Sequence, residues 1–202
     1  MEKLTQTGSG KIQEYNAFIS GCTVILPKDL KSLSIQKPED MLEVALHLSK
    51  TICSDPHMLP VKPDEIIAAT SVGLATLMVD SQFAATGFAR LNPWKNAEGE
   101  TKGLELGSVW IHPDLRNHHL AQLLIEQLIG DTYSQEKNVP IFAVVTEDNV
   151  PSKKLFQRLE NWQEQLLTAQ ETENYSKFFI NGINIFEGWN LPSVIYWYNQ
   201  NI

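Results

Sequence analysis

The segment from Val109 to Ala121 has the backbone and side chains best suited to binding and chemistry. A strand-like run ends at Ile111, Pro113 stops it, and a helix-like pattern follows. The first N–H groups of a helix have no partner within the helix, and the helix dipole favours negative charge there. Arg116 adds a cation at the mouth of this turn. The segment therefore predicts a binding site for an anion.

The same segment resembles the GNAT acetyltransferases. In that family a strand is followed by the pattern Arg/Gln-x-x-Gly-x-Gly/Ala, whose backbone amides surround the pyrophosphate of acetyl-CoA. Arg116, Leu120 and Ala121 match the pattern, and a Trp-Ile-His-Pro-Asp stretch typical of the family precedes them. His119 stands where the family has a glycine, which lets backbone and phosphate approach closely. His118 and His119 could instead donate hydrogen bonds to phosphate oxygens.

A second match begins at Asn149 and resembles the Asn-x-x-Ala-x-x-Leu-Tyr helix start of the family. The resemblance implies that Asn149 contacts the pantetheine arm and that Ser152 lies at the cofactor. Phe156 stands where the family has a tyrosine that protonates the departing thiolate. A phenyl ring can pack against the cofactor but cannot give up a proton. Tyr196 or Tyr198 could replace that acid.

Residues 77–91 also look like the second and third strands of the family, so the resemblance covers roughly residues 74–162. It implies an acyl-CoA-dependent N-acyltransferase that transfers acetyl from acetyl-CoA to an amine by direct attack. The implied cofactor-binding residues are Val109, Trp110, Ile111, Arg116, Asn117, His118, His119, Leu120, Ala121, Asn149, Ser152 and Phe156. The main chain at Val109 and Ile111 would pair with pantetheine like an extra strand, and an N–H near Ile111 would stabilise the oxyanion.

Glu105 is the candidate catalytic residue. It stands eleven residues before Arg116, where several members of the family place a general base. An amine must be neutral to attack a thioester, so a nearby carboxylate can accept its proton, directly or through water. Burial would raise the pKa of this carboxyl group towards neutrality and improve it as a base. The alternative is a structural glutamate, solvated or paired with a cation on a strand face.

The two departures at His119 and Phe156 support a second hypothesis. The chain would then be a GNAT-fold protein that binds CoA or another ligand without catalysis. A structural or interaction domain is a third interpretation. Zinc is not expected, because His112, His118 and His119 have no cysteine or carboxylate at ligand spacing.

The composition of the chain limits the classes of partner that can be expected. The net charge of −8, from 16 basic and 24 acidic residues, disfavours nucleic acid and mildly favours a cationic substrate, although solubility explains it equally well. The acceptor is expected to be a small-molecule amine or an amine of a protein or peptide, bound mainly by residues 27–73 and 163–192.

No apolar run is long enough to span a membrane, and the N-terminus lacks the apolar core of a signal peptide. With only Cys22 and Cys53, a cytoplasmic protein is expected; the oligomeric state is not predicted.

The elements that must position these residues can be read from the apolar pattern. Strand-like runs cover residues 22–26, 74–79, 83–91, 104–111, 141–145, 178–186 and 194–198. Helical patterns cover residues 38–52, a short segment from Pro63, residues 117–129 and residues 151–159. The order predicts an α/β fold: a mixed, mostly antiparallel sheet with a central parallel strand pair, flanked by helices. Residues 1–20 are expected to be a tail or lead-in, and residues 21–202 a single acyltransferase domain.

Overall fold

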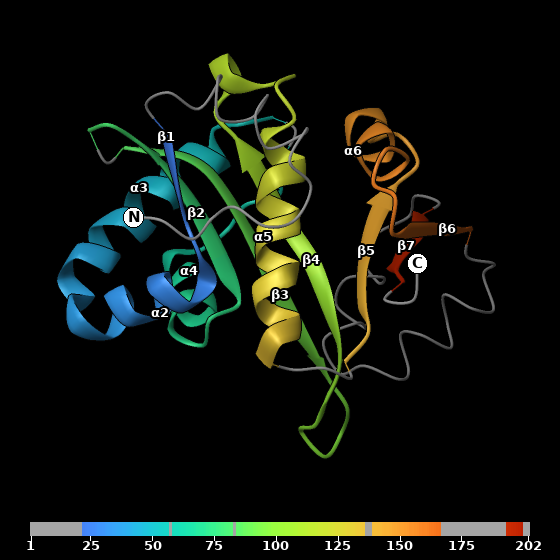
Figure 1. The fold of residues 1–202 in the computed structure, drawn as a ribbon, viewed down its shortest axis with the longest axis horizontal. Coiled ribbons are helices and arrows are strands. Elements are labelled where there is room, and N and C mark those ends of the chain that lie inside the picture. Colours follow the sequence, from blue (N-terminus) through green and yellow to red (C-terminus); the bar gives the residue numbers. More distant parts are fainter. Residues whose placement is uncertain (1–21, 57, 83, 136–138, 167–192, 200–202) are drawn as a thin grey trace. The chain divides into compact units, whose positions relative to one another are not determined.

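The computed structural model describes residues 22–56, 58–82, 84–135, 139–166 and 193–199. Figure 1 labels the elements of this part of the chain. In chain order they are β1 (Cys22–Ile25), α2 (Pro27–Gln36), α3 (Pro38–Cys53), α4 (Pro63–Ser71), β2 (Ala75–Asp80), β3 (Ala85–Lys95), β4 (Thr101–Ile111), a 3-10 turn (Pro113–Leu115), α5 (Leu120–Gln135), β5 (Ile141–Thr146), α6 (Val150–Phe156), β6 (Trp162–Leu166) and β7 (Ser193–Tyr198).

Within the described residues, seven strands form one sheet in the order β1-β2-β3-β4-β5-β7-β6. The pairing of β4 with β5 is parallel, and it joins Leu104 to Ile141 and Glu105 to Phe142. The β1–β2, β5–β7 and β6–β7 pairs are antiparallel. The predicted fold class is confirmed: a mixed, mostly antiparallel sheet with a central parallel pair and flanking helices.

The described chain forms two compact units, and β3 and β4 contribute residues to both. Unit 1 consists of the described residues up to Ala89 together with Val109–Asp131. Unit 2 consists of Arg90–Ser108 and the described residues from Thr132 onward. The predicted anion-binding turn therefore belongs to unit 1, whereas Glu105 and the helix start at Asn149 belong to unit 2.

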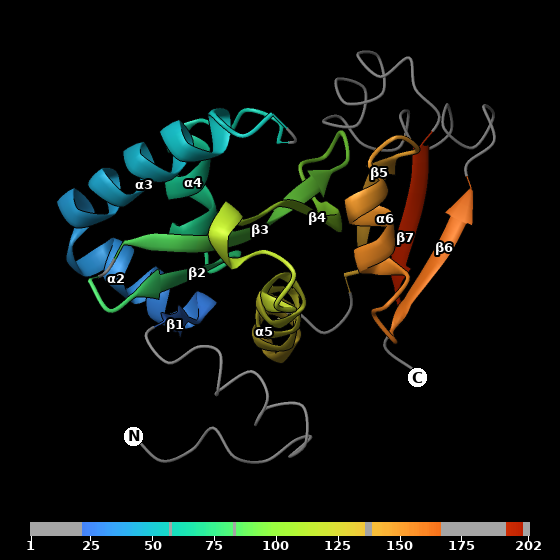
Figure 2. The same cartoon turned by 90° about the horizontal axis from the view of Figure 1, so that it is seen from above.

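Alternation along β2 divides the core of unit 1 into two faces. Ala75, Leu77 and Val79 pack into a cluster with buried residues of α2, α3 and α4, whereas the side chain of Met78 points to the other face. On that second face, a Cβ placed on Gly87 would lie 2.9 Å from Cδ1 of Leu124 in α5. Glycine thus allows the close packing of α5 against the sheet. Figure 2 shows α3 and α4 on one side of β2 and β3, and α5 on the other.

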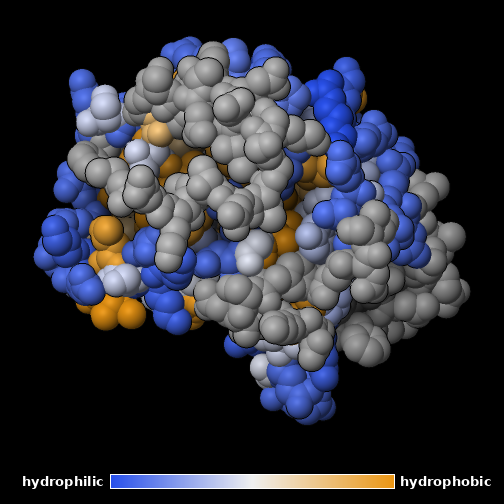
Figure 3. Space-filling model, in the orientation of Figure 1, coloured by the Kyte–Doolittle hydropathy of each residue, from blue (hydrophilic) through white to orange (hydrophobic). Residues whose placement is uncertain are grey.

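Three helices of unit 1 begin with a proline in the first turn: Pro27, Pro38 and Pro63. Proline has the φ angle of a helix already and loses no hydrogen bond at this position. The sequence predicted α3 and α4 but not α2, whose residues carry a weak apolar pattern. Four large apolar side chains of α2 and α3 are exposed, at Leu33, Ile35, Leu42 and Leu46. Figure 3 shows apolar surface in the region where Figure 1 draws α2.

The structure corrects several predicted boundaries. The helix predicted over 117–129 is α5, which begins at Leu120, because Asn117 and His119 have left-handed backbone angles (φ 68° and 60°). The helix predicted over 151–159 ends at Phe156, and β3 continues beyond residue 91 to Lys95. The strand β6 was not predicted. The expected strand 194–198 is confirmed as β7, and the expected strand 178–186 lies outside the described residues.

Aromatic side chains form the core of unit 2. Trp94 and Phe142 meet edge to face with ring centroids 4.9 Å apart, and Trp197 lies 5.3 Å from Phe142 on centroids. A Cβ on Gly103 would lie 2.9 Å from the ring of Phe142, so glycine makes room for this ring beside β4. The cluster fixes the part of β4 that carries Glu105.

Candidate active site

The turn between β4 and α5 is the best candidate for an anion site. His119 accepts the first hydrogen bond of α5, from the N–H of Leu123, so the N–H groups of residues 120–122 precede the helical ladder. Left-handed backbone at Asn117 and His119 gives the turn a shape that glycine adopts without strain. His119 therefore has a left-handed backbone conformation, which the glycine of the family pattern would adopt without strain. Its side chain is exposed, as is that of Asn117.

Arg116 is held by two contacts within unit 1. Its Nε donates to the carbonyl oxygen of Ile111 at 3.1 Å, and its Nη2 forms an ion pair with the carboxylate of Asp55. The Arg116 side chain is 37% exposed and that of Asp55 only 5%. Asp55 was not among the predicted site residues, since the residues that pair are 61 positions apart in the sequence. An acidic residue in a proline-containing loop gave no signal of this partner.

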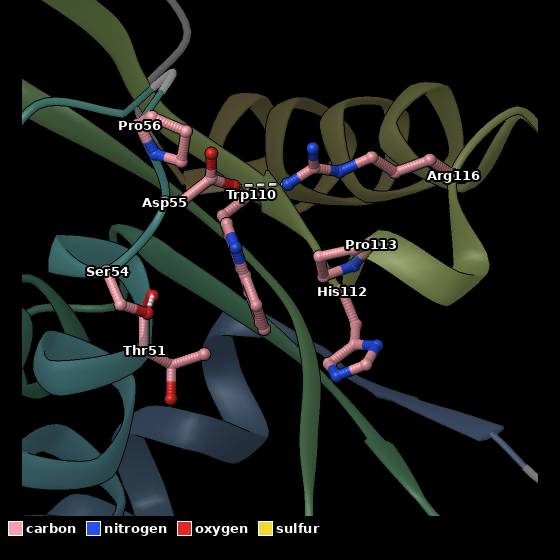
Figure 4. Close-up of a pocket in the computed structure, with 8 residues that line it drawn as sticks. All are labelled: Thr51, Ser54, Asp55, Pro56, Trp110, His112, Pro113 and Arg116. Atoms are coloured by element: carbon pink, nitrogen blue, oxygen red, sulfur yellow. Dashed lines mark hydrogen bonds and ion pairs between the residues drawn. The ribbon is translucent and has the colours of Figure 1, made fainter.

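The ion pair forms part of the wall of a pocket of about 410 Å³ in unit 1. Figure 4 shows the residues that line the pocket, which come from the end of α3, the following loop, the end of β4 and the segment after it. They are Thr51, Ser54, Asp55, Pro56, Trp110, His112, Pro113 and Arg116. The hydroxyls of Thr51 and Ser54 donate back to the carbonyls of His47 and Thr51. Their oxygens can therefore only accept hydrogen bonds from a ligand.

The predicted cofactor residues at the end of β4 differ in burial and in the face of the sheet on which they lie. Trp110 is 2% exposed and packs with the cluster beneath α3 and α4. Ile111 is 7% exposed and faces the opposite side, where its Cδ1 lies 3.0 Å from the Cβ position of Gly87. These side chains belong to the core, so main-chain groups are what this strand end can offer to a ligand. Val109 is half-buried, as are His118 and Ala121, and Leu120 is buried.

Ser108 interrupts the regular backbone of β4. Its φ of 52° is left-handed, which is rare for a serine inside a strand. Within unit 2, the Nε of Arg90 donates to Oγ of Ser108 at 3.2 Å. The interruption separates the part of β4 that carries Glu105 from the part that ends at Ile111.

Glu105 is buried, with 8% of its surface exposed. The indole N–H of Trp94 donates to its Oε2 at 2.9 Å, and the side-chain amide of Asn92 donates a second hydrogen bond. Burial raises the pKa of Glu105 above its ordinary value, while Trp94, Asn92 and the nearby charge of Arg90 act in the opposite direction. The carboxyl group is therefore held in one orientation, with its pKa moved towards the range useful to a general base.

The sequence analysis missed the partners of Glu105. Arg90, Asn92 and Trp94 alternate along β3, so their side chains lie on one face of the strand. The alternation is visible in the sequence at residues 90, 92 and 94. It was missed because the strand was predicted to end at residue 91, before Pro93, whereas β3 continues through Pro93 to Lys95.

In α6, Asn149 is the N-cap, and its Oδ1 accepts the backbone N–H of Ser152 at 3.2 Å. The Nδ2 hydrogens are the part of this side chain that can donate to a ligand. Ser152 is half-buried. The cap explains the asparagine at this helix start.

Phe156 is 4% exposed and packs between two other rings of unit 2. It stacks on Tyr196 at 4.8 Å between centroids and meets Trp162 edge to face at 4.8 Å. The hydroxyl of Tyr196 donates to Glu164 at 3.1 Å. Burial, together with this hydrogen bond to Glu164, raises the pKa of Tyr196 to about 12. Such a hydroxyl gives up its proton less readily than an ordinary tyrosine.

Comparison with known proteins identifies the class to which this fold and turn belong. The family model described as "Acetyltransferase (GNAT) family" matches residues 52–160. The chain therefore belongs to the GNAT acetyltransferase family, whose acyl donor is acetyl-CoA. Family membership implies acyl transfer in general.

Solved structures resemble the chain in fold. The protein yncA from Salmonella typhimurium, solved with acetyl-CoA, has a TM-score of 0.55 and 14% identity, over 88% of this chain and 92% of its own. Diaminobutyrate acetyltransferase from Paenibacillus lautus, solved with L-2,4-diaminobutyric acid and coenzyme A, has a TM-score of 0.56 and 10% identity, over 78% and 90%. N-acetylglutamate synthase from Neisseria gonorrhoeae, solved with coenzyme A and N-acetyl-glutamate, has a TM-score of 0.54 and 12% identity, over 89% and 35%.

Comparison with curated protein sequences gives no match. In the part of the chain that the structure describes, none of the helices has the length and apolar character needed to cross a membrane.

Proposed function

We propose that the protein is an acyl-CoA-dependent N-acyltransferase that transfers acetyl from acetyl-CoA to an amine by direct attack. The observation that carries this proposal is the β4–α5 turn, which combines the family pattern with left-handed backbone at Asn117 and His119. The acceptor is a small-molecule amine or an amine of a protein or peptide. The proposal treats residues 21–202 as one domain and includes a cytoplasmic location, as expected from the low cysteine content.

In this proposal the turn from Arg116 to Ala121 holds the diphosphate of acetyl-CoA. Backbone N–H groups at the start of α5 point towards an anion, and the helix dipole adds to the attraction. The main chain at Val109 and Ile111 pairs with the pantetheine arm, and Asn149 donates to it through Nδ2. These contacts fix the thioester relative to the acceptor, which lowers the entropic part of the barrier.

Glu105 accepts the proton of the attacking amine, directly or through water. Its buried site raises the pKa of the carboxyl group, and the hydrogen bonds from Trp94 and Asn92 keep the ionised form accessible. The amine nitrogen bonds to the thioester carbon, a backbone N–H near Ile111 stabilises the oxyanion, and the C–S bond then breaks. A thiolate with an ordinary pKa near about 8.5 can leave without a strong acid.

The alternative function is a GNAT-fold protein that binds CoA or another ligand without catalysis. The specific observation in its favour is Phe156, which is buried against Tyr196 and Trp162 at the place of the family's acid. The high pKa of Tyr196 makes that residue a weak substitute.

The test combines calorimetric titration of the protein with acetyl-CoA and a thiol-release assay over a panel of amines. We expect saturable binding and release of free thiol that depends on one class of amine. Binding with no thiol release by any amine would favour the alternative. A chain that does not bind acetyl-CoA at all would contradict both functions.

A further inference from the structure

The guanidinium of Arg116 is already engaged by the protein. It bridges the carbonyl oxygen of Ile111 and the carboxylate of Asp55, which lies in the loop after α3 (Figure 4). The planar fork of an arginine can make both contacts at once, which an ammonium group at the end of a flexible chain cannot do with the same geometry. Arg116 thus connects two segments of unit 1 that are distant in sequence.

Asp55 makes this arrangement costly to break. Its side chain is 5% exposed, and a carboxylate removed from water must be compensated by a cation and hydrogen bonds. If Arg116 turned away from Asp55 to bind a phosphate, the buried carboxylate would lose this cation. Loss of a cationic partner from a buried charge is strongly destabilising. The ion pair therefore favours the orientation of Arg116 seen here.

The location of Arg116 gives the ion pair an effect on the turn. The residue directly precedes Asn117, the first of the two left-handed residues, and its side chain is fixed at both contacts. Left-handed backbone is unfavourable for residues other than glycine and persists when the surrounding structure holds it. The pair of Asp55 and Arg116 supplies such a constraint on one side of the turn.

We infer that Asp55 is a positioning residue for cofactor binding: through Arg116 it holds the β4–α5 turn in its binding shape, and the turn's backbone amides contact the diphosphate. This inference rests on the proposed function, since it takes CoA to bind at this turn. It assigns a role to Asp55 that the family pattern around Arg116 does not contain. It also gives Arg116 a positioning role, through the two N–H groups that contact Ile111 and Asp55.

The sign of one substitution separates the two roles. If Asp55 positions the turn, Asp55→Asn weakens CoA binding on the order of tenfold, which lies within the usual range for residues in one network. Arg116→Ala then weakens it similarly, and the double variant is no worse than the single variants. If Arg116 is a direct phosphate ligand, Asp55→Asn frees it, and CoA binding tightens or stays unchanged. Calorimetric titration with CoA measures each case, and the last result would overturn the inference.

Controls separate positioning from general effects on charge or folding. Asp114→Asn also removes a negative charge beside the turn, from a side chain that is 88% exposed, so it should leave CoA affinity unchanged or slightly higher. Affinity for acetyl-pantetheine, which lacks the diphosphate, should be the same in Asp55→Asn and the parent. An equal loss for acetyl-pantetheine and CoA would mean general damage to the fold and would contradict the inference.

Arg116→Lys keeps the test decisive if Asp55→Asn does not fold. A lysine retains the charge but not the fork, so a positioning role predicts a loss close to that of Arg116→Ala. Near-parental CoA affinity in Arg116→Lys would overturn the inference, because a point charge would then be sufficient. If the parent itself fails to bind CoA while remaining folded, the proposed function fails, and that outcome is distinct from every variant result above.

Discussion

The β4–α5 turn and the site of Glu105 differ in which part of the chain they offer to a ligand. The turn offers backbone amides, and the side chains of Asn117 and His119 on it are exposed. The Glu105 site offers one side chain, which is buried and held by donors from β3. A backbone site depends on its φ and ψ angles, so the side chains on it can vary. A side-chain site depends on the identity of its residues and of their donors.

The largest effect is expected from Glu105→Gln, which keeps the shape of the side chain and removes the base. General-base catalysis contributes about 10²–10⁴-fold, so kcat/KM with an authentic amine should fall within that range. The measurement is thiol release at saturating acetyl-CoA, with CoA affinity measured in parallel. A loss smaller than about threefold would make Glu105 a structural residue and not a general base.

The same variant has a stability signature with a defined sign. Because burial raises the pKa of Glu105 above 4.5, the folded chain binds its proton more tightly than the unfolded chain does. Between the unfolded and the folded pKa, the parent therefore loses stability as the pH rises. The glutamine variant lacks this loss, so its Tm should improve relative to the parent as the pH rises above about 4.5. A Tm difference that is constant over this range would contradict the assignment.

A smaller effect is expected from Trp94→Phe, which removes the indole donor to Glu105 but keeps an aromatic ring. The hydrogen bond lowers the pKa of Glu105, so its loss should raise that pKa and move the acidic limb of the kcat/KM profile to higher pH. At neutral pH the activity should fall about tenfold, as expected for a hydrogen bond to a charged group. Trp197→Phe is the matched control, because that indole packs on the same Phe142 but donates to Gln165. Equal profiles for the two variants would contradict a role for Trp94.

On the turn, His119→Gly separates backbone from side chain. Glycine adopts φ near 60° without strain, so the variant should be more stable by up to about 1 kcal/mol in thermal melts. Asn117→Gly is the control with a smaller gain, since the short polar side chain of asparagine can hydrogen-bond locally and makes left-handed backbone less unfavourable.

For CoA binding we expect His119→Gly to weaken affinity about three- to tenfold, as for loss of a charge-assisted hydrogen bond. Calorimetric titration of the parent and the variant with CoA measures the change. Tighter binding by the glycine variant would identify the imidazole as an obstruction. The turn would then be a purely backbone site.

The smallest effect is expected from Phe156→Tyr. The ring is buried in a stack, and a thiolate of ordinary pKa near about 8.5 leaves without help, so kcat should rise by no more than about threefold. Thiol release at saturating substrates measures it. A tenfold rise would show that proton delivery limits the parent.

The sequence predicted the fold where local patterns and the family resemblance agreed. The apolar spacing of residues 38–52 and 141–145 corresponds to α3 and β5, and the parallel pair at the centre of the sheet was expected. The helix α2 was missed, because it is stabilised by contacts with other segments of unit 1 and its own apolar pattern is weak. Asp55 and Trp94 were missed for the same physical reason. Their roles come from partners that only the folded chain brings close, 61 positions away in one case and 11 in the other.

The start of α2 has a consequence for the order in which the chain can fold. Pro27 has no N–H to offer, and the N–H of Lys28 donates to the carboxylate of Asp131, at the far end of unit 1 in sequence, at 3.0 Å. That contact spans 103 positions, so the residues of α2 are synthesised long before Asp131, whose carboxylate caps the helix. Closing so long a loop is slow compared with forming a helix turn. We therefore expect α2 to acquire protection from amide hydrogen exchange only after α5 has docked, among the last helices of unit 1 to do so.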